Sequence, residues 1–279
     1  MTLSLYKYAG SLLALGFAAS LTGASGQERP NVVFILADEL RAQDLGYMGN
    51  RDVLTPNLDR LAARSVNFVN TISGCPVSCP YRGSLLTGKY PLSTGVFVND
   101  VLLDPEAETF PKIFRRSGYN TAYIGKWHLD GHGRSTLIPE ERRHDFEYWK
   151  TLECTHDYYN SLYWDNDDRL MKWEGYDAYA QTADAASYIS SRKGNSRPFL
   201  LFLSWGPPHT PFDKSPANLK EYYRSHQISL RKNVPAELSE RATSDLIGYY
   251  AHITALDSCI GVLQKAVSDA GLDRNTIFI

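Results

Sequence analysis

The sequence of 279 residues has few cysteines and no excess of charge of either sign. It contains 29 Lys and Arg against 31 Asp and Glu, a net charge of −2. Such a balance gives no reason to expect nucleic acid or an anionic membrane as a partner. Any anion that the protein binds must therefore be met by a local cluster of cations. Internal repeats and low-complexity linkers are also absent, so the ordinary composition indicates one large globular domain or slightly more.

The cysteines exclude a zinc site of the usual kind. The four residues are Cys75, Cys79, Cys154 and Cys259, and no two of them are spaced as CxxC. In an oxidising compartment they could pair in three ways, among which the sequence does not choose. We expect free or partly paired thiols.

The first residues differ from the rest of the chain. Lys7 is the only charge ahead of an apolar run over residues 9–21, and small residues follow it as far as Gly26. This pattern predicts a secretory signal peptide over residues 1–26 and a periplasmic or secreted protein. The run is short and rich in Ala and Gly for a membrane span. A retained anchor is the alternative, and we favour export without stable membrane association.

Strand and helix patterns alternate along the remaining chain. The apolar run NVVFILA at residues 31–37 is typical of a strand buried on both faces of a parallel sheet. Further strands are predicted at 120–124, 199–204 and 276–279. Helices are predicted after Thr55 and Thr109, at 177–193, and from Leu246 to a stop at Gly271. The alternation predicts an α/β fold with a largely parallel sheet sandwiched by helices.

Two stretches of the chain do not fit this regular alternation. Residues 135–175 are rich in aromatic and charged side chains and poorly periodic, and we expect surface loops over one end of the sheet. The chain stops within the apolar strand at 276–279, without a turn or polar tail. We therefore expect residues 27–279 to be a truncated N-terminal catalytic domain whose smaller C-terminal subdomain is missing.

Polar side chains follow several predicted strands. Asp38 and Glu39 follow the first, Lys126 and His128 another, and His209 a third. Taken singly, the acidic pair is more often a helix cap or a solvated loop pair, and Lys126 and His128 could equally be surface residues. Because ligands of parallel α/β sheets gather at the carboxyl ends of the strands, the common position favours a site. Carboxylates there suit calcium or magnesium.

Residues 75–90, CPVSCPYRGSLLTGKY, are the most informative segment. Pro80 lies two residues after Ser78, Arg82 lies four after it, and Leu-Thr-Gly follows. This spacing resembles the sulfatase signature, in which a Cys or Ser is followed by x-Pro-x-Arg, and the register puts Ser78 rather than Cys79 at the nucleophile position.

The resemblance to sulfatases continues along residues 29–279. RPNVVFILADE resembles the family's opening strand with its acidic pair, GYNTAYIGKWHL its Gly-Lys-Trp-His segment, and PFLLFLSWGPPHTPF its strand ending in Pro-His-x-Pro. The fold implied is that of the alkaline-phosphatase-like superfamily.

The resemblance implies a nucleophile, a metal and a maturation partner. Ser78 would be oxidised to formylglycine, whose hydrated aldehyde attacks sulfur. Asp38, Glu39 and the modified Ser78 would bind Ca²⁺, although many relatives have Asp where Glu39 stands. Too few ligands for calcium are present, so we expect this chain alone to be inactive or severely impaired. A serine-type formylglycine maturase would be required.

Four further catalytic residues are implied by the same resemblance. Arg82 would neutralise charge beside Ser78, and Lys126 would bind sulfate oxygens. His128 would orient or deprotonate the diol, and His209 would contact sulfate and help protonate the leaving oxygen.

The predicted reaction is hydrolysis of a sulfate ester, on a sulfated carbohydrate. The alternatives are a phosphodiesterase or phosphonate monoester hydrolase of the same superfamily, and a non-catalytic degenerate fragment with unmodified Ser78. The aromatic segment around residues 153–159 could line a sugar subsite, but such loops more often pack on their own domain.

Overall fold

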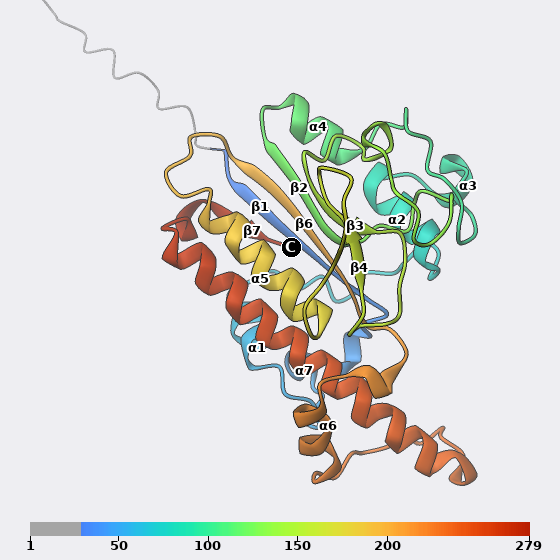
Figure 1. The fold of residues 1–279 in the computed structure, drawn as a ribbon. Coiled ribbons are helices and arrows are strands. Elements are labelled where there is room, and N and C mark those ends of the chain that lie inside the picture. Colours follow the sequence, from blue (N-terminus) through green and yellow to red (C-terminus); the bar gives the residue numbers. More distant parts are fainter. Residues whose placement is uncertain (1–28) are drawn as a thin grey trace, which may run out of the picture.

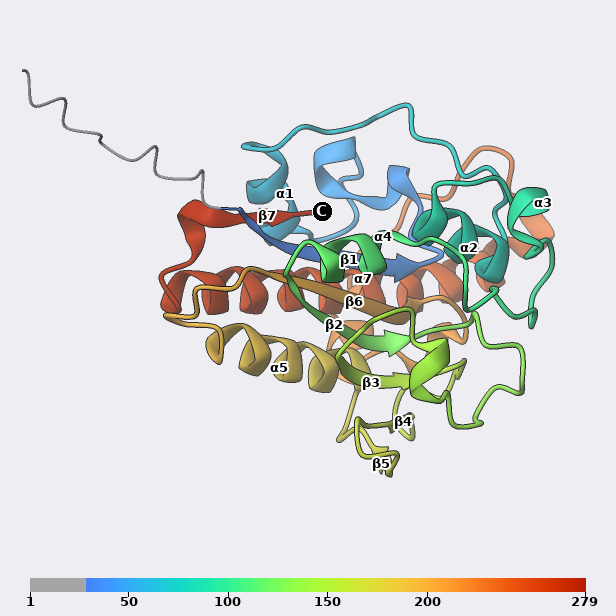
Figure 2. The same ribbon diagram turned by 90° about the horizontal axis from the view of Figure 1, so that it is seen from above.

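The computed structural model describes residues 29–279, whose strands form one mixed sheet. The signal peptide predicted for residues 1–26 lies outside the described residues. The sheet has seven strands in the order β5-β4-β3-β2-β6-β1-β7, which lie side by side in Figure 2. The four neighbouring pairs from β3 to β7 are parallel, whereas β3-β4 and β4-β5 are antiparallel. Bounds are β1 Asn31–Asp38, β2 Asn120–Lys126, β3 Tyr148–Leu152, β4 Leu162–Trp164, β5 Leu170–Lys172, β6 Phe199–Pro208 and β7 Thr276–Phe278.

The central strands are apolar on both faces because helices cover both. In β1, Val33 packs into the core below α5 and α7, while Val32 packs into a second core with α2 and α4. This two-sided burial explains why the sequence of β1 shows no alternation. Figure 1 shows α5 and α7 running together along the sheet. Helix bounds are α1 Pro56–Ala62, α2 Ser78–Thr87, α3 Pro91–Thr94, α4 Phe110–Arg116, α5 Asp177–Ser190, α6 Ala217–Arg224 and α7 Ser239–Asp269.

The α/β fold and its largely parallel sheet are confirmed. The four predicted strands and four predicted helices are all present, with ends that differ by a few residues. The largest differences are that β6 continues to Pro208 and that α7 begins at Ser239. Gly118 and Gly271 follow α4 and α7 in left-handed conformations, as stop signals require.

The prediction of loops over residues 135–175 was wrong in part. This stretch contains β3, β4 and β5, which extend the sheet beyond β2. Strand β3 pairs with β2 in parallel, and its Trp149 and Thr151 are fully buried. The sequence pattern hid these strands because they are only three to five residues long and lie among charged turns.

Helix α7 belongs to the core of the fold. Residues Ala236–Asp269 are long and apolar enough to cross a membrane by length and composition, but 72% of the most apolar window is buried inside the protein. Its residues Leu256, Ile260 and Leu263 pack under the sheet beside α5. The four cysteines, all within the described residues, form no disulfide.

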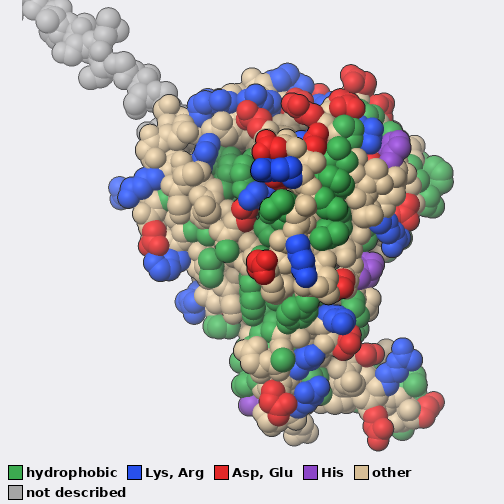
Figure 3. Space-filling view, in the orientation of Figure 1, with side chains coloured by type: hydrophobic (Ala, Val, Ile, Leu, Met, Phe, Trp, Pro, Cys, Tyr) green, Lys and Arg blue, Asp and Glu red, His purple; other side chains and the backbone are tan. Residues whose placement is uncertain are grey.

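The surface carries charges of both signs. On the face in Figure 3, Lys and Arg side chains are interspersed with Asp and Glu. Two buried cations, Arg82 and Lys126, lie where the parallel strands end.

Candidate active site

Three strands place their last polar residues at one edge of the sheet. Asp38 ends β1, Lys126 ends β2, and His209 follows the end of β6. A shift in register between β1 and β6 brings Asp38 beside Pro208, the residue before His209. The structure therefore brings together the residues that the sequence placed at strand ends.

Ser78 is the first residue of α2 and lies half-buried. The side chain of Asn99 accepts a hydrogen bond from the Cys79 amide at 3.0 Å, which satisfies one free donor of this helix end. One turn along the helix, Arg82 Nε donates to Ser78 Oγ at 3.2 Å. The helix thus fixes the spacing between these two side chains that the sequence motif prescribes.

Arg82 is the centre of the buried part of the site, with 3% of its surface exposed. Its Nη1 donates to the Lys126 carbonyl at 2.9 Å and to Ser204 Oγ at 2.7 Å. Its Nη2 lies 3.8 Å from Asp38 Oδ1 and has no hydrogen-bond partner. The guanidinium therefore joins α2, β2 and β6, and it keeps one buried donor free beside Ser78 and Asp38.

Asp38 and Lys126 form a close ion pair. Lys126 Nζ donates to Asp38 Oδ2 at 2.5 Å, and Lys126 is 7% exposed. Burial of Asp38 opposes ionisation, but the charges of Arg82 and Lys126 outweigh it and lower the pKa of the carboxyl group. Asp38 is therefore an anion held between two cations.

His128 lies next to this pair and is 2% exposed. Its Nε2 lies 3.1 Å from Asp100 Oδ1, and its Nδ1 has no hydrogen-bond partner. Burial and the charge of Lys126 lower the pKa of His128 to about 4, against the effect of Asp100. At neutral pH the ring is uncharged, and one of its nitrogens can accept a proton.

Glu39 and His209 form the exposed side of the site. The Glu39 side chain is 56% exposed, and its Oε1 lies 3.3 Å from His209 Nε2. Tyr249 holds the Glu39 carbonyl through a 2.7 Å hydrogen bond. Glu39 adopts φ +61°, an unusual conformation for a residue other than glycine, which turns the chain sharply after β1. Its carboxylate therefore lies beside His209 rather than against Lys126.

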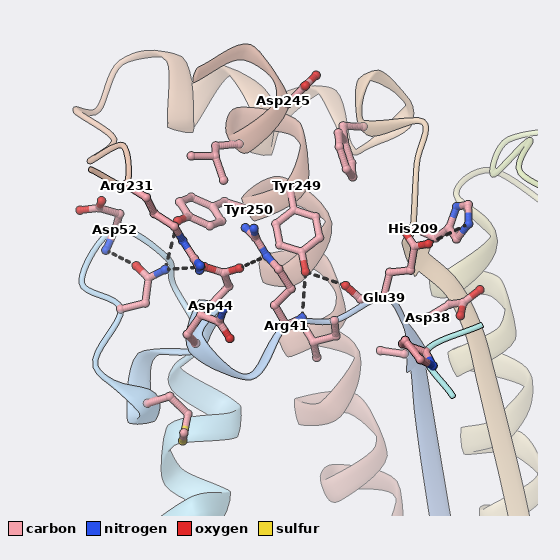
Figure 4. Close-up of a pocket in the computed structure, with 18 of the residues that line it drawn as sticks. Asp38, Glu39, Arg41, Asp44, Asp52, His209, Arg231, Asp245, Tyr249 and Tyr250 are labelled. Carbon is pink, nitrogen blue, oxygen red and sulfur yellow. Dashed lines mark hydrogen bonds and ion pairs between the residues drawn. The ribbon is translucent and has the colours of Figure 1, made fainter. Parts of the chain in front are cut away.

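An open cleft of about 1660 Å³ runs from these residues along the N-terminal part of α7. Figure 4 shows Asp38, Glu39 and His209 at one end of it and Arg231 and Asp52 at the other. Ser78 and Asn99 also line the cleft. A ligand larger than a single sulfate can therefore lie in this cleft while reaching Ser78.

The oxygen donors suit calcium in kind but are few. Asp38 and Glu39 carry carboxylates, the kind of hard oxygen donor that calcium prefers, and they line the same cleft as Ser78. No group of three or more His, Cys, Asp or Glu side chains that could hold a metal occurs in residues 29–279. Calcium takes about six to eight oxygens, so the described residues would supply only part of its coordination.

Sequence reasoning missed several residues that complete the site. Asp100 Oδ1 lies within hydrogen-bond distance of His128 Nε2, and Ser204 Oγ accepts a hydrogen bond from Arg82 Nη1. The ring of His156 stacks on that of His209, with centroids 4.3 Å apart and planes 7° apart. Ser204 was not recognisable because it sits within an apolar strand. A signal existed for His156, since it lies in the aromatic segment that the sequence analysis considered as a sugar subsite.

Comparisons with known proteins point to the same family as the sequence motif around Ser78. The family described as Sulfatase matches residues 30–279. The chain is 46% identical over 252 residues to an ulvan-active sulfatase of Formosa agariphila. The alignment covers 90% of this chain and 49% of that protein. The solved structure of yidJ from Bacteroides fragilis aligns with a TM-score of 0.85 and 32% identity, covering 92% of this chain and 62% of the other.

A further solved structure contains a sulfated sugar. BT4656, in complex with its substrate D-glucosamine-2-N,6-O-disulfate, aligns with a TM-score of 0.68 and 25% identity, covering 90% of this chain and 64% of the other. The chain spans about half the length of the curated relatives it matches.

Proposed function

The chain belongs to the sulfatase family, and on that basis we propose that the complete protein hydrolyses sulfate esters on a carbohydrate. Formylglycine made from Ser78 would be its nucleophile, and Ca²⁺ its metal. The observation that carries the proposal is the position of Ser78 at the start of α2, bonded to Arg82, which also faces the Asp38–Lys126 ion pair.

Asp38, Glu39 and the modified residue 78 would hold calcium. When bound, calcium would make a hydroxyl of the hydrated aldehyde more acidic and so supply the attacking oxyanion. The unpaired Arg82 Nη2 is a buried donor with room for one more acceptor, and a second oxygen on residue 78 would provide one. Plain serine, with its single oxygen already bonded to Arg82 Nε, does not.

The buried cations would stabilise charge on the sulfate group. Lys126 ends β2, and its Nζ lies 2.5 Å from Asp38 Oδ2, so the cation is already at the site before substrate binds. Arg82 would neutralise charge at residue 78. Donors fixed in place before the reaction stabilise developing charge more effectively than donors that must reorganise.

The two histidines would handle protons. His128 is uncharged at neutral pH and would orient or deprotonate the nucleophile. His209, on the exposed side of the cleft, would contact sulfate and help protonate the leaving oxygen. General acid and base assistance of this kind is worth ~10²–10⁴ in rate.

The substrate class follows from the cleft and the relatives. A cleft of about 1660 Å³ exceeds what one sulfate group needs, and the named relatives act on ulvan and on a sulfated glucosamine. We propose a sulfated glycan substrate and a periplasmic or secreted protein, matured by a serine-type formylglycine-generating enzyme. Residues 27–279 alone, with too few calcium ligands, would be inactive or severely impaired.

The full-length protein, produced with the maturase, provides the test. We expect mass spectrometry of the peptide carrying Ser78 to show a residue one H₂ lighter than serine that reacts with hydrazides. We also expect sulfate release from sulfated oligosaccharides. Unmodified Ser78 in a fully active protein would refute the nucleophile, and activity on aryl sulfates alone would refute the carbohydrate.

A phosphodiesterase or phosphonate monoester hydrolase remains the competing function. Rates on matched sulfate and phosphate esters separate it from a sulfatase. We expect faster hydrolysis of the sulfate ester, and the reverse order would favour the phosphate-directed enzyme.

A further inference from the structure

Residues 153–158 follow β3, and they contact His209 and the backbone that directly follows His128. We name them the bracing segment. They form the first part of the aromatic stretch that the sequence analysis considered as a sugar subsite. None of the six lines the cleft that contains Ser78, so their contacts with the histidines indicate a role other than binding sugar.

Glu153 holds the turn that follows His128. Its buried carboxylate, 1% exposed, accepts hydrogen bonds from three successive amides: Leu129 at 3.1 Å, Asp130 at 2.8 Å and Gly131 at 3.0 Å. His128 itself has φ +59°, a conformation that costs energy for a residue with a side chain. The three bonds fix the backbone next to this unfavourable conformation, and thereby the direction of the His128 ring.

His156 and Tyr158 hold His209 from two sides. The His156 ring lies parallel to the His209 ring, with 4.3 Å between centroids. The hydroxyl of the fully buried Tyr158 donates to the His209 carbonyl at 2.7 Å. The ring and the backbone of His209 are therefore both fixed by the bracing segment.

The contact between His156 and His209 is a stack of two rings and not an ion pair. Burial, His209 and Lys126 together lower the pKa of His156 to about 4, so this ring is uncharged at neutral pH. Cys154 Sγ lies 3.8 Å from His156 Nε2 on the strand side. The His156 ring is thus a flat, neutral surface against which the His209 ring can pack.

We propose that the bracing segment positions the two histidines for catalysis, with His156 setting the orientation of the His209 ring and Glu153 that of His128. The inference rests on the proposed function, in which both histidines transfer protons. Proton transfer needs the ring nitrogen within hydrogen-bond reach of its partner, and a displacement of about 1 Å can cost 10²-fold in rate. Packing alone would not require one segment both to contact His209 and to fix the backbone that follows His128.

The test compares His156→Ala with His156→Phe, which keeps a flat ring, in the full-length matured protein. His226→Ala is the matched control, because the exposed His226 also stacks on an aromatic ring, that of Tyr222, away from the cleft. We expect His156→Ala to lower kcat on a sulfated sugar by ~10–100-fold with KM little changed. We expect His156→Phe to recover most of kcat and His226→Ala to leave it unchanged.

Two further readouts separate positioning from general loss of structure. On an aryl sulfate, whose leaving oxygen needs little protonation, His156→Ala should lose less activity than on the sugar. In NMR spectra, the ring-current shift on the His209 ring protons should disappear in His156→Ala and persist in His156→Phe. Glu153→Gln, which keeps the shape of the side chain, should lower kcat without altering the His209 signals.

The outcomes are distinguishable. Equal losses on both esters, or no loss in His156→Ala beyond that of His226→Ala, would overturn the positioning role. A wild-type protein that cleaves no sulfate ester would overturn the proposed function instead, and the His209 ring shift would still report whether His156 sets the ring orientation.

Discussion

The two sides of the candidate site are built differently. On one side, which we call the buried wall, Arg82, Lys126 and His128 are at most 7% exposed, and Arg82 bonds to residues of β2 and β6. On the other, the open wall, Glu39 and Arg41 are 56% and 43% exposed and line the cleft. The buried wall is fixed by the sheet itself, whereas the open wall is formed by turns that follow the strands.

This difference indicates that the two walls would have different roles. In the proposed function, groups that act on the sulfate would need a fixed geometry and would gain strength from a water-excluded setting. Groups that meet the variable remainder of a substrate can be exposed. Substitutions in the buried wall should therefore affect both stability and turnover, and those in the open wall chiefly turnover.

Ser78→Ala should have the largest effect on activity. It removes the residue that would become the nucleophile in the proposed function, and we expect turnover to fall by at least ~10⁴-fold. Stability should fall by only about 1 kcal/mol, because one buried donor, Arg82 Nε, loses its acceptor. Sulfate release and thermal unfolding measure the two quantities.

The control for this substitution lies on the same helix. Ser84 is also part of α2, and its hydroxyl makes no hydrogen bond, so Ser84→Ala should leave activity intact. Comparable losses in the two variants would show that α2 as a whole, rather than residue 78, determines activity.

Arg82→Met should lower both turnover and the stability of the fold. It leaves Asp38 with Lys126 as its only close cation and removes the bonds to Ser204 and the Lys126 carbonyl. Breaking a buried ion pair costs about 3 kcal/mol, and losing a donor to the developing charge costs ~10²–10³ in kcat. Chemical denaturation and steady-state kinetics test this.

Arg41→Met is the matched variant in the open wall. Arg41 pairs with Asp44 and lies over the Tyr249 ring, but it is exposed, so we expect a stability loss of less than about 1 kcal/mol. Equal destabilisation by both substitutions would contradict the distinction between the two walls.

Acid should destabilise the buried regions. Burial lowers the pKa of His128, His144 and His252 to about 4 in the folded protein, below the ordinary 6.5. Between these values the unfolded chain binds protons that the folded chain does not. The stabilisation that these histidines contribute is therefore fully present above pH 6.5. It is lost as the pH falls toward 4, by at most about 1.4 kcal/mol per pH unit for each histidine.

Buried carboxyl groups work in the opposite direction, since burial raises the pKa of Asp177, Glu153 and Asp257. Burial raises the pKa of Asp177 to about 7, so the folded chain keeps a proton that the unfolded chain releases above about 3.8, and stability rises as the pH falls through this window. Free energies of unfolding measured from pH 7 to 4 test the balance. His252→Asn, at a buried residue that does not line the cleft, should flatten the slope, and an unchanged slope would exclude His252 as a source.

The sequence predicted the buried wall better than the open wall. Ser78 and Arg82 share one helix, so their spacing in the motif carried over directly into a contact. Lys126 followed a recognisable strand, and strand ends converge in a parallel sheet. By contrast, the contact between His156 and His209 joins two turns that are 53 residues apart in sequence. The short strands β3 to β5, which place the bracing segment, carried too little periodicity to be recognised.

Glu39→Gln should have the smallest effect, and it tests whether the open wall contributes to the metal site. Because the Glu39 carboxylate is 56% exposed and lies 3.3 Å from His209, it would be a weaker calcium ligand than Asp38. We expect chelator-treated Glu39→Gln enzyme to need several-fold more calcium for half-maximal activity, at most ~10-fold. Asp38→Asn should raise the requirement further, since Asp38 is the carboxylate that the buried wall holds in place. An unchanged calcium requirement in Glu39→Gln, together with a lower kcat, would mean that Glu39 serves His209 alone, and the metal site would then belong entirely to the buried side.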